Sequence, residues 1–146
     1  MKTKKELETL IIGPRLLPVT EGLNLSDELS KLPPNVQERL LRLQQLQQTL
    51  QSILAQKQQV EMEKSEVEQT LAEMAKTADD AVIYKAIGSL LVKSDKTKIS
   101  TDLNERKDLL VTRSTVIAKQ EERIRSQVKE TQTKLQEDIN PIAGQQ

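Results

Sequence analysis

Apolar residues recur at alternating spacings of three and four between Pro34 and Lys76, and this pattern most constrains what the chain can form. Most positions of two interleaved seven-residue series are apolar. The first series holds Val36, Leu43, Leu50, Lys57, Lys64 and Leu71, and the second holds Arg39, Leu46, Ile53, Val60, Val67 and Met74. A mean spacing of about 3.5 residues keeps one face of a helix toward a partner helix. Residues 34–76 are therefore predicted to form one long helix of a coiled coil, with Pro34 in its first turn, where the missing N–H is not needed.

Two lysines, Lys57 and Lys64, interrupt this seam. Either they loosen the middle of the coiled coil, or their methylene stems cover the seam while the ammonium groups reach water. The pattern leaves both interpretations open, and we favour the second.

A second, weaker heptad pattern predicts a helix over residues 101–140. Its two series hold Leu103, Leu110, Ile117, Ile124 and Thr131, and Lys107, Ser114, Glu121, Val128 and Leu135. Ser100 or Thr101 is a suitable N-cap, and Asn140 before Pro141 is predicted to end the helix, because the residue before proline disfavours helical geometry. The short segment between the two helices requires them to run antiparallel, so each is expected to cover the seam of the other.

Residues 81–94 carry the signals of a β-hairpin. Two apolar runs, VIYKAI and LLVK, flank the pair Gly88–Ser89, and glycine adopts the positive φ of a two-residue turn without steric cost. In that register Ile83, Lys85, Ile87, Leu90 and Val92 share one face, while Val82, Tyr84, Ala86, Leu91 and Lys93 share the other. Both faces are therefore expected to carry apolar area.

An isolated hairpin is marginal in water, and its edges offer backbone groups for pairing with other chains. We therefore predict that the hairpin pairs with those of other subunits and closes a β-barrel. The predicted oligomer interface consists of Val82, Ile83, Tyr84, Ala86, Ile87, Leu90, Leu91 and Val92. The alternative is a monomer in which the hairpin packs against its own helix ends.

Composition limits the class of protein. Tyr84 is the single aromatic residue, so a compact globular core is not expected. Basic and acidic residues balance at 22 each, which removes the charge expected of a nucleic-acid binder. The chain has no histidine, no cysteine and no glycine-rich phosphate loop, and we predict neither an enzyme nor a metal or cofactor site. No stretch reaches the roughly 20 apolar residues of a membrane span, and we expect a cytoplasmic protein.

Residues 1–31 are predicted to be a flexible extension, because Gly13, Pro14, Pro18 and Gly22 would break a helix repeatedly. The alternative is a conditional docking segment, since this region also carries Leu10, Ile11, Ile12, Leu16 and Leu17. Residues 32–140 form the predicted domain, and residues 141–146 a short tail.

Three stretches resemble the beta subunits of prefoldin, in particular the archaeal ones: LPPNVQERLLRLQQLQQTLQSILAQKQQVE (32–61), DDAVIYKAIGSLLVKSD (79–95) and KQEERIRSQVKE (119–130). The central stretch is the most distinctive. A single hairpin fits the beta class, since alpha subunits carry two. The resemblance implies a mainly α fold, a long antiparallel two-helix coiled coil with one central β-hairpin that joins an oligomeric β-barrel. The extension before Leu32 departs from the usual beta subunit.

The family also implies a hetero-hexamer of two alpha and four beta subunits. Such a hexamer captures unfolded proteins without ATP and transfers them to a group II chaperonin. Where the helix ends fray, far from the hairpin, seam residues lose their partners and face solvent. The predicted client-binding residues are Leu32, Val36, Leu40, Ile139 and Ile142, whereas Leu43 and Leu135 are expected in ordinary coiled-coil packing. The alternative function is a coiled-coil scaffold or adaptor without chaperone activity.

Overall fold

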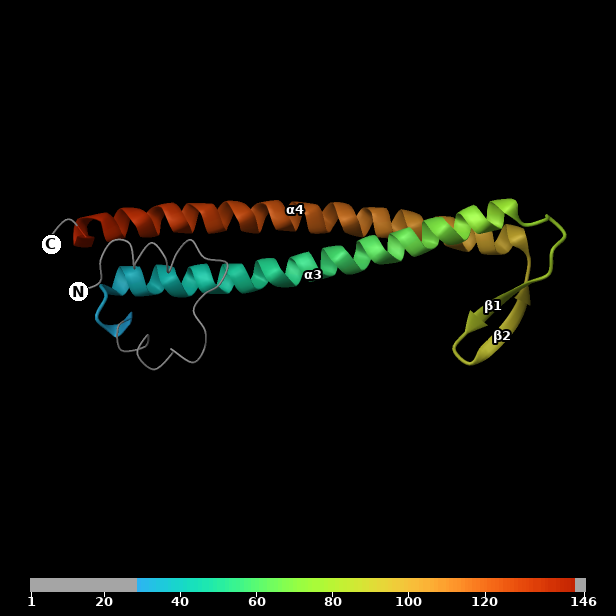
Figure 1. Cartoon of the computed structure of the whole chain (residues 1–146), viewed down its shortest axis with the longest axis horizontal. Coiled ribbons are helices and arrows are strands. Elements are labelled where there is room, and N and C mark those ends of the chain that lie inside the picture. The colour runs from blue at the N-terminus through green and yellow to red at the C-terminus, as the bar shows by residue number, and fades with distance from the viewer. Residues whose placement is uncertain (1–28, 144–146) are drawn as a thin grey trace. The chain divides into compact units, whose positions relative to one another are not determined.

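The computed structural model describes residues 29–143, and for residues 141–143 the backbone alone. The elements are helix α3 (Pro34–Lys76), strands β1 (Ile83–Ile87) and β2 (Leu90–Ser94), and helix α4 (Lys96–Ala143), in that order (Figure 1). The predicted fold class, two long helices around a central antiparallel hairpin, is confirmed. Most of the predicted extension, including the apolar run from Leu10 to Leu17, lies outside the described residues.

The chain divides into two compact units, and each long helix contributes to both. Of the described residues, those up to Ile53 and those from Glu121 onward form the terminal unit, and the hairpin unit is Leu54–Gln120. Within each unit the two helices lie side by side (Figure 1).

Paired side chains show that the helices of the hairpin unit run antiparallel. Glu61 of α3 accepts a hydrogen bond of 3.1 Å from Ser114 of α4, and Glu68 lies 3.7 Å from Lys107. The α4 partner therefore moves backward along the sequence as the α3 residue moves forward, as the intervening hairpin requires.

The heptad seam of α3 is buried as predicted. The buried apolar residues of α3 are Val36, Leu43, Leu46, Ile53, Val60, Val67 and Met74, all members of the two predicted series. Those of α4 are Leu110, Ile117, Leu135 and Ile139, with the seam residue Glu121 buried beside them. Lys57 is exposed and Lys64 half-buried, so the lysine positions carry less of the buried area than their apolar neighbours.

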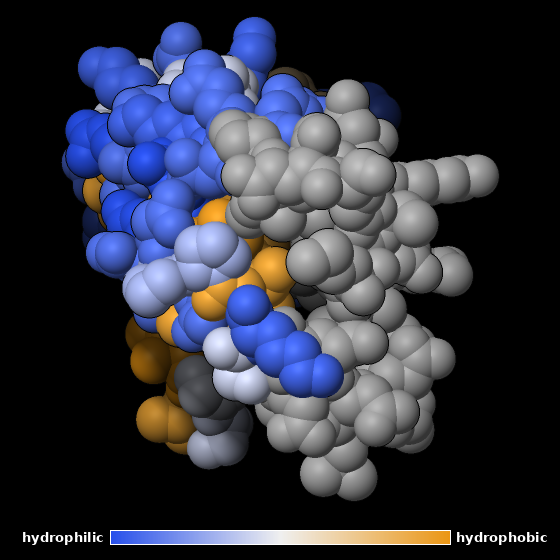
Figure 2. All heavy atoms as spheres, turned by 90° about the vertical axis from the view of Figure 1, so that its left-hand side faces the viewer, coloured by the Kyte–Doolittle hydropathy of each residue, from blue (hydrophilic) through white to orange (hydrophobic). Residues whose placement is uncertain are grey.

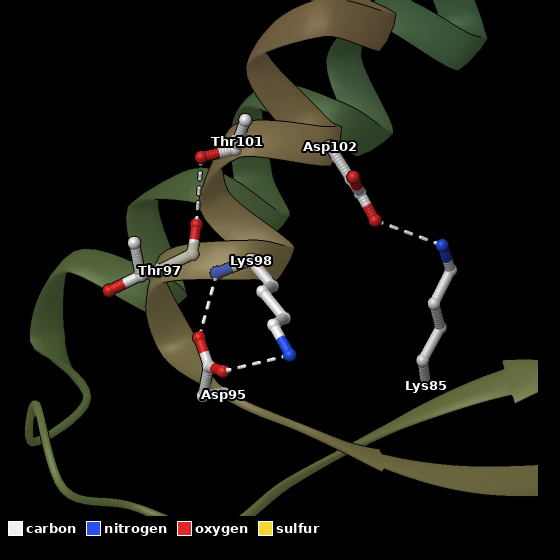
Figure 3. Close-up of polar contacts among 6 residues, drawn as sticks. All are labelled: Lys85, Asp95, Thr97, Lys98, Thr101 and Asp102. Atoms are coloured by element: carbon white, nitrogen blue, oxygen red, sulfur yellow. Dashed lines mark hydrogen bonds and ion pairs between the residues drawn. The ribbon is translucent and has the colours of Figure 1, made fainter.

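Helix α4 begins five residues earlier than the predicted residue 101. Asp95 caps it, since its carboxylate accepts a hydrogen bond of 2.8 Å from the backbone N–H of Lys98. The hydroxyl of Thr101, which we predicted as a cap, instead donates to the Thr97 carbonyl inside the helix, at 2.9 Å (Figure 3). Asp95 is the better cap because it directly follows β2, so the helix starts as soon as the strand ends.

The predicted stop at Asn140 is also wrong, because α4 continues to Ala143. A proline removes one backbone donor and crowds the carbonyl of the preceding turn. Pro141 lies in the last turn of α4, which ends two residues later at Ala143. The missing N–H therefore costs the helix one hydrogen bond at its end and does not interrupt its interior.

Candidate assembly and client-contact surfaces

The hairpin has the predicted register. Ile87 pairs with Leu90, Lys85 with Val92, and Ile83 with Ser94, so the turn consists of Gly88 and Ser89. Gly88 has a φ of 59°, the positive value that a hairpin turn with glycine in its first central position requires.

The Gly88 turn gives a direct test of the hairpin's importance. Replacement of Gly88 by alanine should destabilise the hairpin by about 1–2 kcal/mol, because an L side chain disfavours positive φ. A Cβ at this position would meet no atom within 4 Å, so the effect comes from the backbone alone. Amide hydrogen exchange of the two strands should become faster in Gly88→Ala and stay unchanged in the control Ser89→Ala. Equal exchange rates in the two variants would show that the positive φ of Gly88 does not stabilise the hairpin.

The hairpin exposes apolar side chains on both faces. On one face Tyr84 is 59% and Leu91 73% exposed, and on the other Ile87 is 55% and Leu90 67% exposed. Val82, Ala86 and Val92 are also exposed, while Ile83 is half-buried. Such an apolar surface on a two-stranded sheet marks a site of contact with another protein.

Polar contacts tie the hairpin to the helices of its own unit. Lys85 in the middle of β1 forms an ion pair of 3.0 Å with Asp102 of α4 (Figure 3). Lys96, the first residue of α4, donates to the Thr77 carbonyl at 2.8 Å and to Asp79 at 2.9 Å, and so holds the end of α3 beside the start of α4. The hairpin is thus held to the helices by a few polar contacts, and the apolar side chains on its two faces stay exposed.

The tip of the terminal unit contains a closed apolar cluster. Val36, Leu43, Leu135 and Ile139 are each at most 1% exposed, and we call them the tip cluster. Leu32, Leu40 and Val128 are partly buried against it. Figure 2 looks onto this end, and in its coloured part an apolar area lies next to mainly hydrophilic residues.

Two hydrogen bonds and one ion pair hold the tip together. The amide of Gln37 donates to the Leu32 carbonyl at 2.6 Å and to the Ser30 carbonyl at 3.2 Å, which fixes the chain before α3 against the first turn of that helix. Arg39 of α3 and Asp138 of α4 form an ion pair of 2.6 Å across the seam. Two turns earlier in α4, a hydrogen bond from Lys134 and its positive charge lower the pKa of the Glu130 carboxyl.

The predicted client-binding residues therefore differ in accessibility. The expected exposure of Val36 and Ile139 is wrong, because each completes the seam of the opposite helix. Leu32 and Leu40 are half-buried and present part of their surface. The side chain of Ile142 lies outside the described part of the chain. Leu43 and Leu135 pack in the seam as expected.

Sequence reasoning missed several exposed apolar residues of the hairpin unit. Leu109 and Val116 are 60% and 49% exposed. They lie seven residues apart and outside both α4 seam series, and this spacing is a signal that a second helix face carries apolar residues.

The described residues show neither a membrane-spanning nor a metal-binding feature. Within residues 29–143, neither helix has a stretch that is both long and apolar enough to cross a bilayer. In the same part of the chain, no group of three or more acidic, histidine or cysteine side chains is placed to hold a metal ion.

A family model, curated relatives and a solved structure all match this chain to prefoldin subunits. The model of the prefoldin subunit family matches residues 37–141. The chain is 47% identical over 112 residues to a prefoldin subunit beta of Methanothrix thermoacetophila, covering 77% of this chain and 93% of the relative. It is 41% identical over 116 residues to the subunit beta of Archaeoglobus fulgidus, covering 80% of this chain and 100% of the relative. The crystal structure of the prefoldin beta subunit from Thermococcus strain KS-1 is similar, with a TM-score of 0.69 and 36% identity, covering 73% of this chain and 94% of that one. With its single hairpin between two heptad helices, the chain belongs to the prefoldin family and is of the beta-subunit type.

Proposed function

We propose that the chain assembles through its hairpin with an alpha-type prefoldin subunit into a hexamer of two alpha and four beta subunits. The hairpins close a β-barrel, which removes the free strand edges and covers the apolar face that turns to the barrel interior. The observation that carries this proposal is the hairpin itself, whose Leu90 and Leu91 point to opposite faces and are 67% and 73% exposed. Among the described residues, the helices of the chain leave apolar side chains on both faces of the sheet exposed.

The proposed activity is capture of unfolded proteins in the cytoplasm without nucleotide, followed by their transfer to a group II chaperonin. Leu32 and Leu40 offer partly exposed apolar surface at the tip, and burial of such surface stabilises contact by about 25 cal/mol per Å². Val36 and Ile139 contribute only when the helix ends separate. Each contact is weak, and several tips that act on one client raise the effective concentration.

Reconstitution with an alpha-type subunit tests the proposal. Native mass spectrometry should find a complex of two alpha and four copies of this chain, and the complex should slow aggregation of a chemically unfolded client without ATP. A homodimer that leaves client aggregation unchanged would support the scaffold function instead.

The tip variant Leu32→Ser/Leu40→Ser tests the client surface separately from the fold. These side chains are only partly buried, so the variant should keep the hexamer and weaken suppression of client aggregation by roughly tenfold, the effect of about 1.4 kcal/mol. Light scattering at several chaperone concentrations measures this shift. Val111→Ser is the control, since Val111 is an exposed apolar residue of the hairpin unit. Unchanged suppression by the tip variant would remove these residues from the client surface.

One observation favours the alternative of a scaffold without chaperone activity. The tip cluster is closed, and the Arg39–Asp138 ion pair joins the two helices beside it. If the tip never opens, the remaining apolar surface is small, and the hairpin alone would define the protein's role.

A further inference from the structure

Helix α3 carries two adjacent leucines near its start that the coiled coil does not fully cover. Leu41 is 59% exposed, and Leu40 is partly buried against the tip cluster. We call these two residues the leucine pair. Exposed leucines are common on protein surfaces, so the meaning of this pair depends on what the chain places beside it.

The chain before α3 approaches the helix on the side of the leucine pair. The amide of Gln37 donates to the Ser30 and Leu32 carbonyls, at 3.2 and 2.6 Å. The leucine pair follows Gln37 by three and four residues, so it lies one turn further along the same face of the helix. One turn advances about 5.4 Å along the axis. The sequence that precedes Ser30 is therefore attached close to the leucine pair.

That preceding sequence contains a short segment rich in large apolar residues. Five of the eight residues 10–17 are leucine or isoleucine, and we call residues 10–17 the apolar segment. Only residues 18–28 separate it from Leu29, where the described chain begins. Even an eleven-residue linker without fixed structure spans roughly 18 Å, which is more than the distance of one helical turn. Such a short tether gives the apolar segment an effective concentration of about 1 mM at the leucine pair.

A charge beside the leucine pair suits this occupant. Glu38 is exposed and lies three residues before Leu41. Within residues 29–143 it has no ion-pair partner. The apolar segment carries one charge, that of Arg15, directly before Leu16. An exposed ion pair of Arg15 with Glu38 would orient the segment more than it would strengthen binding.

We propose that the apolar segment binds the leucine pair of its own chain and so competes with clients for the tip. This inference rests on the proposed function, because Leu40 is also a proposed client contact. Leu16 and Leu17 supply the kind of side chain that a client would supply. With a dissociation constant of about 0.5 mM, the segment would occupy the leucine pair in about two-thirds of the chains. Because only the open third accepts a client, the apparent client affinity falls about threefold.

Disulfide formation within the chain tests this contact, because the sequence contains no cysteine. Thr20→Cys places a thiol shortly after the apolar segment, and Gln44→Cys places one at an exposed position one turn beyond the leucine pair. The control combines Thr20→Cys with Arg42→Cys, which is exposed on a different flank of the same turns of α3. In a complex with a cysteine-free alpha-type subunit, mild oxidation should link Thr20→Cys to Gln44→Cys at least fivefold faster than to Arg42→Cys.

The double variant Leu16→Ser/Leu17→Ser tests the effect on clients. It should abolish the difference between the two disulfide rates. Without the cysteines, it should lower the concentration of complex that half-suppresses client aggregation by about threefold. Leu23→Ser/Leu25→Ser is the matched control, since it makes the same chemical change in the extension but outside the apolar segment. This control should alter neither measurement.

The outcomes separate this inference from the proposed function. Equal disulfide rates for the two cysteine pairs overturn the contact, and disulfide-linked dimers overturn it in favour of a second copy as the occupant. A faster Gln44→Cys disulfide with unchanged suppression by Leu16→Ser/Leu17→Ser overturns the competition, while the proposed function stands. If the complex without substitutions does not slow aggregation, the proposed function is wrong, and the competition with it.

Discussion

Replacement of Leu91 by aspartate is expected to abolish assembly while the single chain keeps its helices. Leu91 is 73% exposed, so the variant loses almost no contact within its own chain. In a barrel the same side chain becomes buried, and loss of a leucine there removes about 1.5–3 kcal/mol per subunit. The buried, unpaired carboxylate adds a further cost of several kcal/mol. Because four such subunits act together, the fraction in the complex should fall by more than a factor of 100 at micromolar concentration.

Size-exclusion chromatography with light scattering measures this loss, and circular dichroism checks the helix content. Leu41→Asp is a matched control, since Leu41 is 59% exposed on α3 and belongs to the terminal unit. It should assemble normally. Normal assembly of Leu91→Asp would show that the hairpin faces are not the interface.

Replacement of Leu43 by alanine is expected to have the largest effect on the stability of the single chain. Leu43 is fully buried in the tip cluster between the helices, and truncation of a buried leucine leaves a cavity. Such changes lower the free energy of unfolding by about 2–5 kcal/mol. A two-helix layer has few other apolar contacts to offset the loss, so the value should lie in the upper part of that range. Loosening of the tip should also make α4 exchange its amide hydrogens faster from Glu130 to Asn140.

Urea unfolding followed by circular dichroism measures the difference. The control Leu41→Ala removes the same atoms from an exposed position two residues earlier and should change the free energy of unfolding by less than about 0.5 kcal/mol. If both variants lose the same stability, α3 is held by its intrinsic helix propensity and not by the seam.

Local periodicity was sufficient to predict the helices and the hairpin. The α3 heptads placed all of that helix's buried apolar residues, and Gly88 identified the turn and thereby the whole register. The prediction was weaker at the start of α4, because Asp95, Ser100 and Thr101 are all good N-cap residues. Only the path of the chain after β2 selects Asp95.

Of the two candidate surfaces, the hairpin faces were predictable from the sequence, and the exposure of the tip residues was not. Alternation along two strands predicted which hairpin side chains share a face, and the register confirms those faces. Whether Val36 and Ile139 are exposed depends on how the two helix ends meet, and residues so far apart in sequence carry no local signal of that meeting.

By itself, the sequence determined the two heptad helices, the hairpin between them and the apolar character of both hairpin faces, because each follows from spacings of a few residues. Only the tertiary structure decided that the tip cluster closes and that Leu109 stays exposed. Both depend on the antiparallel match between α3 and α4, which brings together side chains from opposite ends of the domain. For this reason the hairpin surface was predictable in residue detail, and the exposure of the tip residues was not.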